Sequence, residues 1–173
     1  MSDYVWLDAE MTGLSYKNCR LIEVACILTK EDLVPYASFE RIIYQNPHVG
    51  WEQVAKEMHE KSGLYDRVMN EGILERIAIS QLDNFLALHL DRRVGNLAGN
   101  SVHCDRLFIM EQWPSLMKFF SHRILDVSSF KIYAEGLGVK KFDLNAPAHR
   151  AMDDIEHSLK EFKYYLAEIR KLP

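Results

Sequence analysis

The sequence predicts an α/β fold in which a mixed β-sheet is covered by helices on both faces. Three strand-like apolar runs come first, within residues 4–44, and a helix, a strand, a helix, a strand and a helix follow. The chain has 173 residues, which is near the usual size of one domain, and it shows no linker, repeat or low-complexity segment. We therefore expect a single domain that spans residues 1–173.

The first three elements are predicted to be strands joined by short turns. An apolar run begins at Tyr4 and, if it stays extended, reaches Glu10. The run from Arg20 to Thr29 is rich in β-branched residues and suits a central strand, and residues 38–44 form a third strand. Three strands in succession indicate a meander.

The rest of the chain is predicted to be mainly helical. A helical pattern covers residues 51–62 with Gly63 in the position of a C-terminal cap, and Asn70 can cap a longer helix over residues 72–90. A short strand at 94–101, a helix at 105–113 that stops at Pro114, and a strand followed by a helix within 123–138 come next. The last helix is predicted from apolar residues at helical spacing: Ile155, Leu159, Phe162, Leu166 and Ile169.

The composition excludes several classes of protein. Hydrophobic residues make up 48% and charged residues 27%, as in an ordinary soluble globular protein. Because the formal net charge is −4, any nucleic acid that the protein handles should be short or held by a local site. Three cysteines without C-x-x-C spacing favour a reducing, cytoplasmic setting, and no apolar run has membrane length, so no membrane partner is expected.

The segment WLDAEMTGL, residues 6–14, places two carboxylates at the end of the first strand. Side chains two apart on a strand point to the same side, so Asp8 and Glu10 would face one point. Two anions that converge in this way need a cation, a proton or solvent. On this pattern alone, a solvated turn after a strand is an equal alternative.

Further carboxylates follow at positions that the topology can bring to the same end of the sheet. They are Asp105, Asp126 and the pair Asp153 and Asp154. Asp105 could instead cap a helix, Asp126 is more consistent with a turn or cap, and Asp153 is the less favoured member of its pair. Together with Asp8 and Glu10, these residues offer enough oxygen ligands for two Mg²⁺ or Mn²⁺ ions per active site. Paired metals of this kind serve phosphodiester hydrolysis.

A hydrolytic site of this type also needs a group that takes the proton from the attacking water. His149 lies at the junction between a loop and the last helix, five residues before Asp154. Imidazole has an ordinary pKa of about 6.5, which suits a general base at neutral pH. The alternative is a surface histidine of a loop. The other six histidines are expected to be surface or packing residues, apart from a possible substrate role of His122.

Three motifs in the chain, LDAEMTGL, GNSVHCDR and HRAMDDI, resemble in sequence and order the three motifs of the DEDDh exonucleases, most closely the oligoribonuclease group. The similarity extends over nearly the whole chain. It implies a ribonuclease H-like fold and a 3′-to-5′ exoribonuclease that converts short RNA, especially dinucleotides, to nucleoside 5′-monophosphates. It also implies a homodimer.

The resemblance gives a role to each candidate residue. Asp8 would be shared by both metals, Glu10 and Asp154 would bind one metal, and Asp105 the other, with His149 as the general base. The substrate contacts would be an apolar wedge at Leu14 and a polar cap over the 5′ phosphate, made by Ser101, Arg123 and Ser128.

The chain departs from the family pattern at three places. Ala9 replaces the usual leucine between the first two carboxylates. Where relatives have a tryptophan five residues before the histidine that matches His59, this chain has Val54, and the nearest tryptophan is Trp51. His122 replaces a tyrosine that reaches the substrate across the dimer. Two alternatives therefore stay open: an exonuclease of the same family that trims longer RNA or DNA, and an inactive nucleic-acid-binding module.

Overall fold

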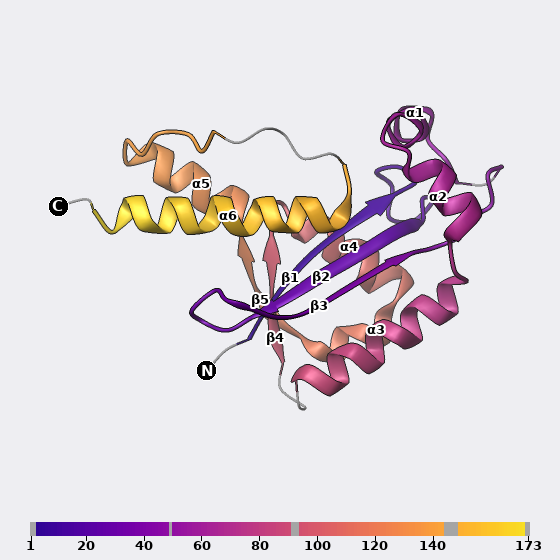
Figure 1. Cartoon of the computed structure of the whole chain (residues 1–173), viewed down its shortest axis with the longest axis horizontal. Helices are drawn as coiled ribbons and strands as arrows, with labels where there is room; N and C mark the ends of the chain where they lie inside the picture. The colour runs from indigo at the N-terminus through magenta and orange to yellow at the C-terminus, as the bar shows by residue number, and fades with distance from the viewer. Residues whose placement is uncertain (1–2, 49, 91–93, 144–148, 172–173) are drawn as a thin grey trace.

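The computed structural model of the protein describes residues 3–48, 50–90, 94–143 and 149–171. Its centre is a five-stranded sheet with the order β3-β2-β1-β4-β5 (Figure 1). The strands are β1 (Tyr4–Met11), β2 (Leu21–Thr29), β3 (Pro35–Ile42), β4 (Gly95–Gly99) and β5 (Phe120–Asp126).

The sheet is mixed, as predicted. β1 pairs with β2, and β2 with β3, in antiparallel direction, whereas β1 with β4 and β4 with β5 are parallel. A parallel neighbour requires a long crossover, and the helices between β3 and β4 and between β4 and β5 supply it. The helices are α1 (Gln53–Lys61), α2 (Leu64–Glu71), α3 (Glu75–Leu90), α4 (His103–Gln112), the short 3₁₀ helix η1 (Pro114–Phe119), α5 (Val127–Gly136) and α6 (Ala151–Ile169).

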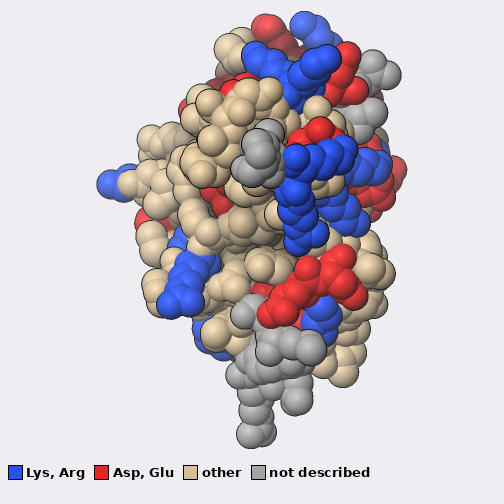
Figure 2. All heavy atoms as spheres, turned by 90° about the vertical axis from the view of Figure 1, so that its left-hand side faces the viewer, with Lys and Arg blue, Asp and Glu red and all other residues tan. Residues whose placement is uncertain are grey.

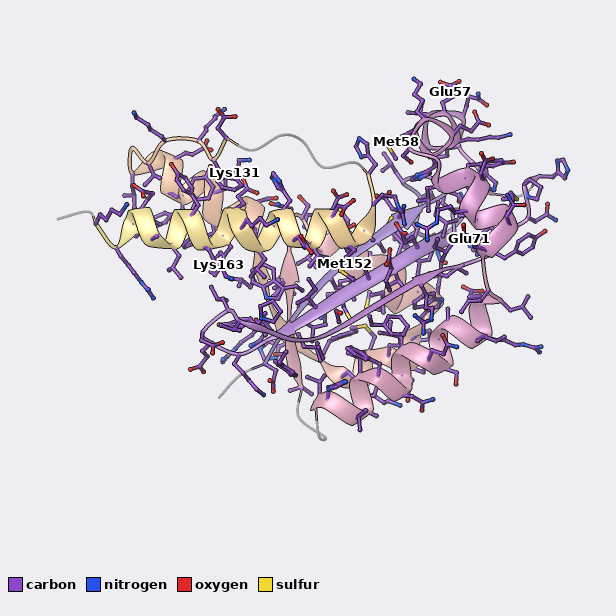
Figure 3. The ribbon with its side chains drawn as sticks, in the orientation of Figure 1. Glu57, Met58, Glu71, Lys131, Met152 and Lys163 are labelled. Atoms are coloured by element: carbon purple, nitrogen blue, oxygen red, sulfur yellow. The ribbon has the colours of Figure 1, made fainter. Side chains whose placement is uncertain are left out.

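Helices cover both faces of the sheet, which confirms the predicted fold class. Side chains alternate along β1, so that Val5, Leu7 and Ala9 pack with residues of α3 and α4 in one buried cluster. Trp6 points to the other face and packs with Ile155, Leu159 and Phe162 of α6 in a second cluster. Met152 extends from α6 to the same cluster (Figure 3). The apolar spacing predicted for the last helix is therefore the face that α6 buries.

Several predicted boundaries are wrong. Asn70 does not cap a helix that starts near residue 72, because it lies inside α2, where its side-chain amide donates to the carbonyl oxygen of Asp66 at 2.8 Å. The prediction missed α2 because the helix is short and buries only Leu64 and Val68. Gly63 does interrupt the helical pattern: its φ of 74° is left-handed, a conformation that glycine adopts without strain.

Two further differences concern prolines. Pro114 does end α4, yet it also begins η1, where a missing backbone N–H costs nothing. Pro35 begins β3, three residues earlier than predicted, at the free edge of the sheet, where proline is tolerated as a first residue. None of the helices in the described ranges is both long and apolar enough to cross a lipid bilayer.

Candidate active site at the end of β1

Asp8 and Glu10 lie on the face of the sheet that α6 covers. They share this face with Trp6, because side chains two apart on β1 point to the same side. Glu10 is buried and Asp8 is half-buried, so neither is the solvated turn residue of the alternative interpretation. Another carboxylate lies opposite Glu10 on the neighbouring strand, because Glu23 of β2 is its register partner.

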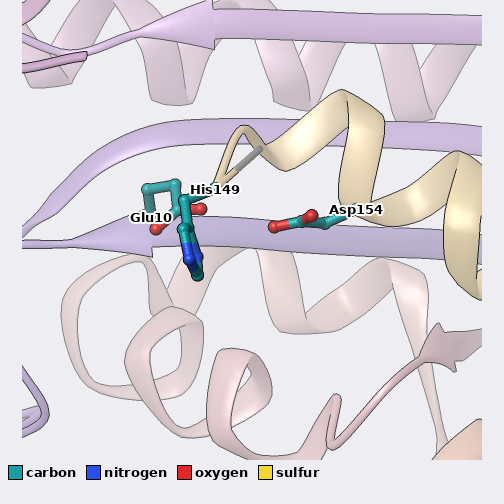
Figure 4. A group of neighbouring side chains, drawn as sticks. All are labelled: Glu10, His149 and Asp154. Atoms are coloured by element: carbon teal, nitrogen blue, oxygen red, sulfur yellow. The ribbon is translucent and has the colours of Figure 1, made fainter. Parts of the chain in front are cut away.

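Glu10, His149 and Asp154 form a compact group. One potential ligand atom from each residue lies within 4.8 Å of the others, and Figure 4 shows the three side chains converging from the end of β1, the segment before α6 and the first turn of α6. His149 is exposed and has a left-handed backbone with φ 53°, which turns the chain into α6. Candidates from the first and the last of the three motifs are therefore neighbours.

Asp105 is attached directly to β1. It is buried in the first turn of α4, and its Oδ1 accepts a hydrogen bond from the backbone N–H of Ala9 at 3.1 Å. It does not act as the N-cap, because Val102 occupies that position. Since Ala9 lies between Asp8 and Glu10, this bond brings a third carboxylate to the end of β1.

The ionised state of this acidic group is strongly disfavoured. Burial, and then the charges of Asp105, Asp154, Glu10 and Glu23, hold the pKa of Asp8 well above its ordinary 3.8. Burial is also the largest cause of the raised pKa of Glu10, Asp105 and Asp154. It raises the pKa of Glu10 to about 8, although the positive charge of Arg150 opposes the shift. The pKa is about 7 for Asp105 and about 6 for Asp154.

The burial and mutual repulsion of these carboxyl groups are consistent with a binding site for a cation. Oδ1 of Asp154 is buried and has no hydrogen-bond partner among the described residues, which is costly for a carboxylate oxygen. Four carboxylates that repel one another would be stabilised by positive charge between them, and hard oxygen donors are what Mg²⁺ and Mn²⁺ prefer. The donor set therefore suits divalent metal ions.

His59 is a residue of this site whose position the sequence did not reveal. Its ring is fully buried, Nε2 lies 2.9 Å from the carbonyl oxygen of Met11 and 3.8 Å from Oε2 of Glu10, and burial lowers its pKa. The prediction placed it with the surface or packing histidines, and it does pack, edge to face, against Trp51. The only signal in the sequence is its match to a histidine of the family pattern.

A small apolar slot of about 220 Å³ opens beside Glu10. Leu14 and Val54 stand at its rim with 91% and 80% of their surfaces exposed, and Met58 of α1 also lines it. Figure 3 labels Met58 at this end of the molecule. Trp51 is not part of the lining: it packs on Tyr65 and donates its indole N–H to the carbonyl oxygen of Asn46.

A wider groove of about 850 Å³ passes the same region. Val54 and Met58 form one wall, and His149 and Arg150 form the other. The exposed His149 therefore faces an open space rather than the protein interior. The slot and the groove share Val54 and Met58, so the groove leads past the acidic group to the slot.

A polar cluster lies at the end of β4. The hydroxyls of Ser101 and Ser128 are 3.1 Å apart, and the N–H of Ser101 donates to Oδ1 of Asp126 at 3.1 Å. Asp126 also accepts from the N–H of Ser128 and caps α5, as expected from the turn or capping interpretation. The structure thus brings two of the predicted cap residues together.

The remaining predicted substrate contacts are farther from this cluster. His122 and Arg123 are exposed on β5, and within the described ranges no hydrogen bond or ion pair joins either side chain to Ser101 or Ser128. Arg123 lies on the same face of β5 as Leu125, which packs in the cluster under α6. Asp153 is exposed on α6, in agreement with its lower rank in the sequence analysis.

Comparison with protein families identifies the class of this protein. Residues 5–162 match the RNase_T family, which is described as "Exonuclease". The match includes β1, α4 and the first turn of α6, and therefore every member of the acidic group. The chain belongs to this family of DEDDh exonucleases.

Within the family, the chain is similar to proteins named oligoribonuclease. It is 37% identical to the "Oligoribonuclease" of Arabidopsis thaliana over 175 residues, which cover 96% of this chain and 78% of the plant protein. It is 34% identical to the "Probable oligoribonuclease" of Drosophila melanogaster, with 98% and 83% covered. It is 35% identical to the "Oligoribonuclease, mitochondrial" of Homo sapiens, with 96% and 73% covered.

Solved structures support the fold. Exonuclease I from Methylocaldum szegediense superposes with a TM-score of 0.72 at 16% identity, and exonuclease I from E. coli in complex with a dT13 oligonucleotide with a TM-score of 0.70 at 11% identity. The alignments cover 99% of this chain but only 41% and 42% of those longer proteins. At such low identity they establish the shared fold alone.

Proposed function

We propose that this exonuclease is an oligoribonuclease that degrades short RNA from the 3′ end, with dinucleotides as preferred substrates and nucleoside 5′-monophosphates as products. The observation that carries the proposal is the convergence of Glu10, His149 and Asp154 within 4.8 Å, at the strand end where Asp8 and Asp105 also lie. The single domain expected for residues 1–173 would contain the complete site.

Asp8, Glu10, Asp105 and Asp154 would hold two Mg²⁺ or Mn²⁺ ions. When bound, such ions activate a water molecule and stabilise the negative charge on the leaving oxygen. The protein places the carboxyl groups in advance, since Asp105 is fixed by Ala9 and Asp154 by α6. The unpartnered Oδ1 of Asp154 supports a role as ligand.

His149 would be the general base that removes the proton from the attacking water. Its side chain is exposed to the groove, where water and substrate can reach it, and it is close to both Glu10 and Asp154.

The slot beside Glu10 would receive the 3′-terminal base. Leu14 and Val54 flank it, so a base could insert between two aliphatic side chains, and Leu14 would act as the wedge. Aliphatic contact replaces the aromatic stacking that a tryptophan at position 54 would offer. We therefore expect weak discrimination among the four bases.

The Ser101 and Ser128 hydroxyls would cap the 5′ phosphate of a dinucleotide, with Arg123 and His122 as further contacts. A cap at this point leaves no path for a longer chain, which would explain a preference for short substrates. The formal net charge of −4 agrees with short substrates. The face drawn in Figure 2, at the C-terminal end of α6, carries both basic and acidic side chains.

We also propose that the protein is a cytoplasmic homodimer. Exposed large apolar residues occur on α4, β5 and α5, and this surface would be covered by a second copy: Leu107, Met110, Ile124, Ile132, Tyr133 and Leu137. The contact would bring His122 of one copy near the site of the other. Sedimentation at micromolar concentration should give the mass of a dimer, and a monomer would contradict this part of the proposal.

Substrate length provides the test of the proposed function. Degradation of an end-labelled diribonucleotide is compared with that of a twenty-mer RNA and of the matching deoxyribonucleotides, each with Mn²⁺. We expect the diribonucleotide to be hydrolysed at least tenfold faster than the other substrates. Comparable rates on the twenty-mer would instead favour a trimming exonuclease, and an absence of hydrolysis on every substrate would favour a binding module.

A further inference from the structure

The first turn of α6 is attached to the sheet through a buried ion pair. Arg150 donates to Oε1 of Glu23 from Nε at 3.1 Å and from Nη2 at 2.7 Å, and Nε is also 3.2 Å from Oε2. Glu23 is fully buried near the start of β2. Nη2 of Arg150 also lies 3.4 Å from Oε1 of Glu40 on β3. The guanidinium group therefore connects α6 to two strands.

Glu23 also caps α6. Arg150 occupies the N-cap position but its side chain makes no capping bond, and the backbone N–H of Ala151 donates to Oε2 of Glu23 at 2.9 Å. The first N–H groups of a helix have no partner inside it, and a local side chain normally accepts from one of them. Here a residue 128 positions earlier performs that task.

Arg150 lies in the sequence between two residues of the candidate active site, His149 and Asp154. His149 precedes it directly with a left-handed φ of 53°, and the N–H of Asp154 donates to the carbonyl oxygen of Arg150 at 3.0 Å. A shift of the Arg150 backbone would therefore move both His149 and Asp154 relative to Glu10. Glu10 itself is on the neighbouring strand, opposite Glu23.

We infer that Arg150 and Glu23 together are positioning residues for this active site, which hold His149 and Asp154 at the correct distance from Glu10. The inference rests on the proposed function, because that function gives the two residues their roles. Neither Arg150 nor Glu23 is assigned contact with the substrate or a metal. Their charges also act on the pKa of Glu10. The positioning itself is geometric and passes through the start of α6.

A purely stabilising ion pair would have different consequences. Removal of one partner of a buried pair destabilises a fold in any location, so a lower melting temperature alone does not distinguish the two roles. A positioning role affects, in addition, the properties of the folded enzyme. The affinity for metal without substrate and the value of kcat should both change, while KM should change little.

The experiment compares wild type, Arg150→Gln, Glu23→Gln and the double variant, with Arg41→Gln as the control. Arg41 lies on β3 and donates a hydrogen bond to Gln81 of α3. This control therefore makes the same arginine-to-glutamine change at a position away from the site. Mn²⁺ affinity is measured by titration calorimetry without substrate. Values of kcat and KM are measured on a diribonucleotide at a temperature where each variant is folded by circular dichroism.

We expect each single variant to lose about 10- to 100-fold in kcat and in Mn²⁺ affinity, as is typical when the partner of a ligand is removed. KM should stay within about threefold. The loss of kcat in the double variant should be no greater than that in the more severely affected single variant, because the two residues act as one unit. The control should match wild type. If Arg150→Gln does not fold, Glu23→Gln decides alone, since its amide oxygen can still accept from Ala151.

Wild-type values of kcat and Mn²⁺ affinity in the folded variants would overturn the inference, and so would fully additive losses in the double variant. Neither result affects the proposed function. That function fails separately, if wild type itself does not hydrolyse the diribonucleotide.

Discussion

The backbone N–H of Ala9 donates a hydrogen bond to Oδ1 of Asp105 at 3.1 Å and thereby joins β1 to α4. One oxygen of this carboxylate is committed to the backbone, so the other is the one available to a metal ion or to its bound water. Burial raises the pKa of Asp105 to about 7, and the bond from Ala9 opposes this shift, since a backbone donor stabilises the ionised carboxylate.

Replacement of Asp105 by asparagine should separate these two tasks. The amide oxygen can still accept from Ala9, while the negative charge is lost. We expect a folded protein, a melting temperature in the absence of metal that is equal to or above wild type at pH 8, and Mn²⁺ affinity at least tenfold weaker. Differential scanning calorimetry and titration calorimetry measure the two quantities. Unchanged Mn²⁺ affinity would remove Asp105 from the proposed set of ligands.

Asp154→Ala should abolish Mn²⁺-dependent hydrolysis, because the buried Oδ1 of Asp154 has no other partner in the described structure. The adjacent and exposed Asp153 provides a matched control. A drop of at least 10³-fold in kcat/KM on a diribonucleotide is expected for Asp154→Ala, and less than threefold for Asp153→Ala. Equal losses in the two variants would show that the helix start, rather than one ligand, had been disturbed.

Replacement of His149 by alanine tests the general base. Loss of a positioned base reduces kcat by about 10²- to 10⁴-fold, whereas substrate binding depends on other residues. The exposed His48→Ala variant is the control. Steady-state kinetics on a diribonucleotide should show the loss in kcat with little change in KM. A loss confined to KM would mean that His149 binds substrate rather than taking the proton.

The stability of the metal-free protein should decrease as pH rises from about 5 to 8. Glu10 has a pKa of about 8 in the folded state against an ordinary 4.5, so the native state keeps a proton that the unfolded state has lost. The free energy of unfolding therefore falls with rising pH across this interval, in the direction that proton linkage requires.

Glu10→Gln removes a carboxyl group whose pKa is raised to about 8 and should make the pH dependence less steep. Saturating Mn²⁺ should do the same in wild type, since bound cations favour the ionised carboxylates. Melting temperatures at pH 5, 6, 7 and 8 provide the measurement. Parallel curves for wild type and Glu10→Gln would show that Glu10 does not titrate in this interval.

Leu14→Ala should weaken substrate binding without loss of stability. The side chain of Leu14 is 91% exposed, so its removal leaves no cavity. As a wedge against the 3′ base it would contribute about 1 kcal/mol, which corresponds to a KM increase of about fivefold. Leu88→Ala, at a residue 75% exposed on α3, is the control. An unchanged KM in Leu14→Ala would exclude the wedge.

The regular part of the fold could be predicted from the sequence because local patterns encode it. Val5, Leu7 and Ala9 alternate with Trp6 and Asp8, and Ile155, Leu159 and Phe162 recur at helical spacing, so the faces of β1 and α6 follow from the order of residues. The convergence of Glu10, His149 and Asp154 was likewise predicted, through motifs at the ends of these elements.

Other features depend on partners that no local pattern announces. Glu23 looks like an isolated charge within an apolar strand, and only the distant Arg150 explains its burial. The aliphatic slot depends on how α1 packs beside β1, which places Val54 rather than Trp51 at the rim. β5 was shorter in the prediction because only Phe120 is buried among its seven residues at the sheet edge, so no apolar alternation marks its start.

The bond from Ala151 to Glu23 also has a consequence for how this protein is made. Its two residues are 128 positions apart, so the whole segment from Glu23 to Ala151 must leave the ribosome before the bond can form. Until then a nascent chain displays Asp8 and Glu10 but not Asp154. Nuclease capacity would therefore emerge only after α6 has been made, and fragments that end before α6 should be inert towards RNA.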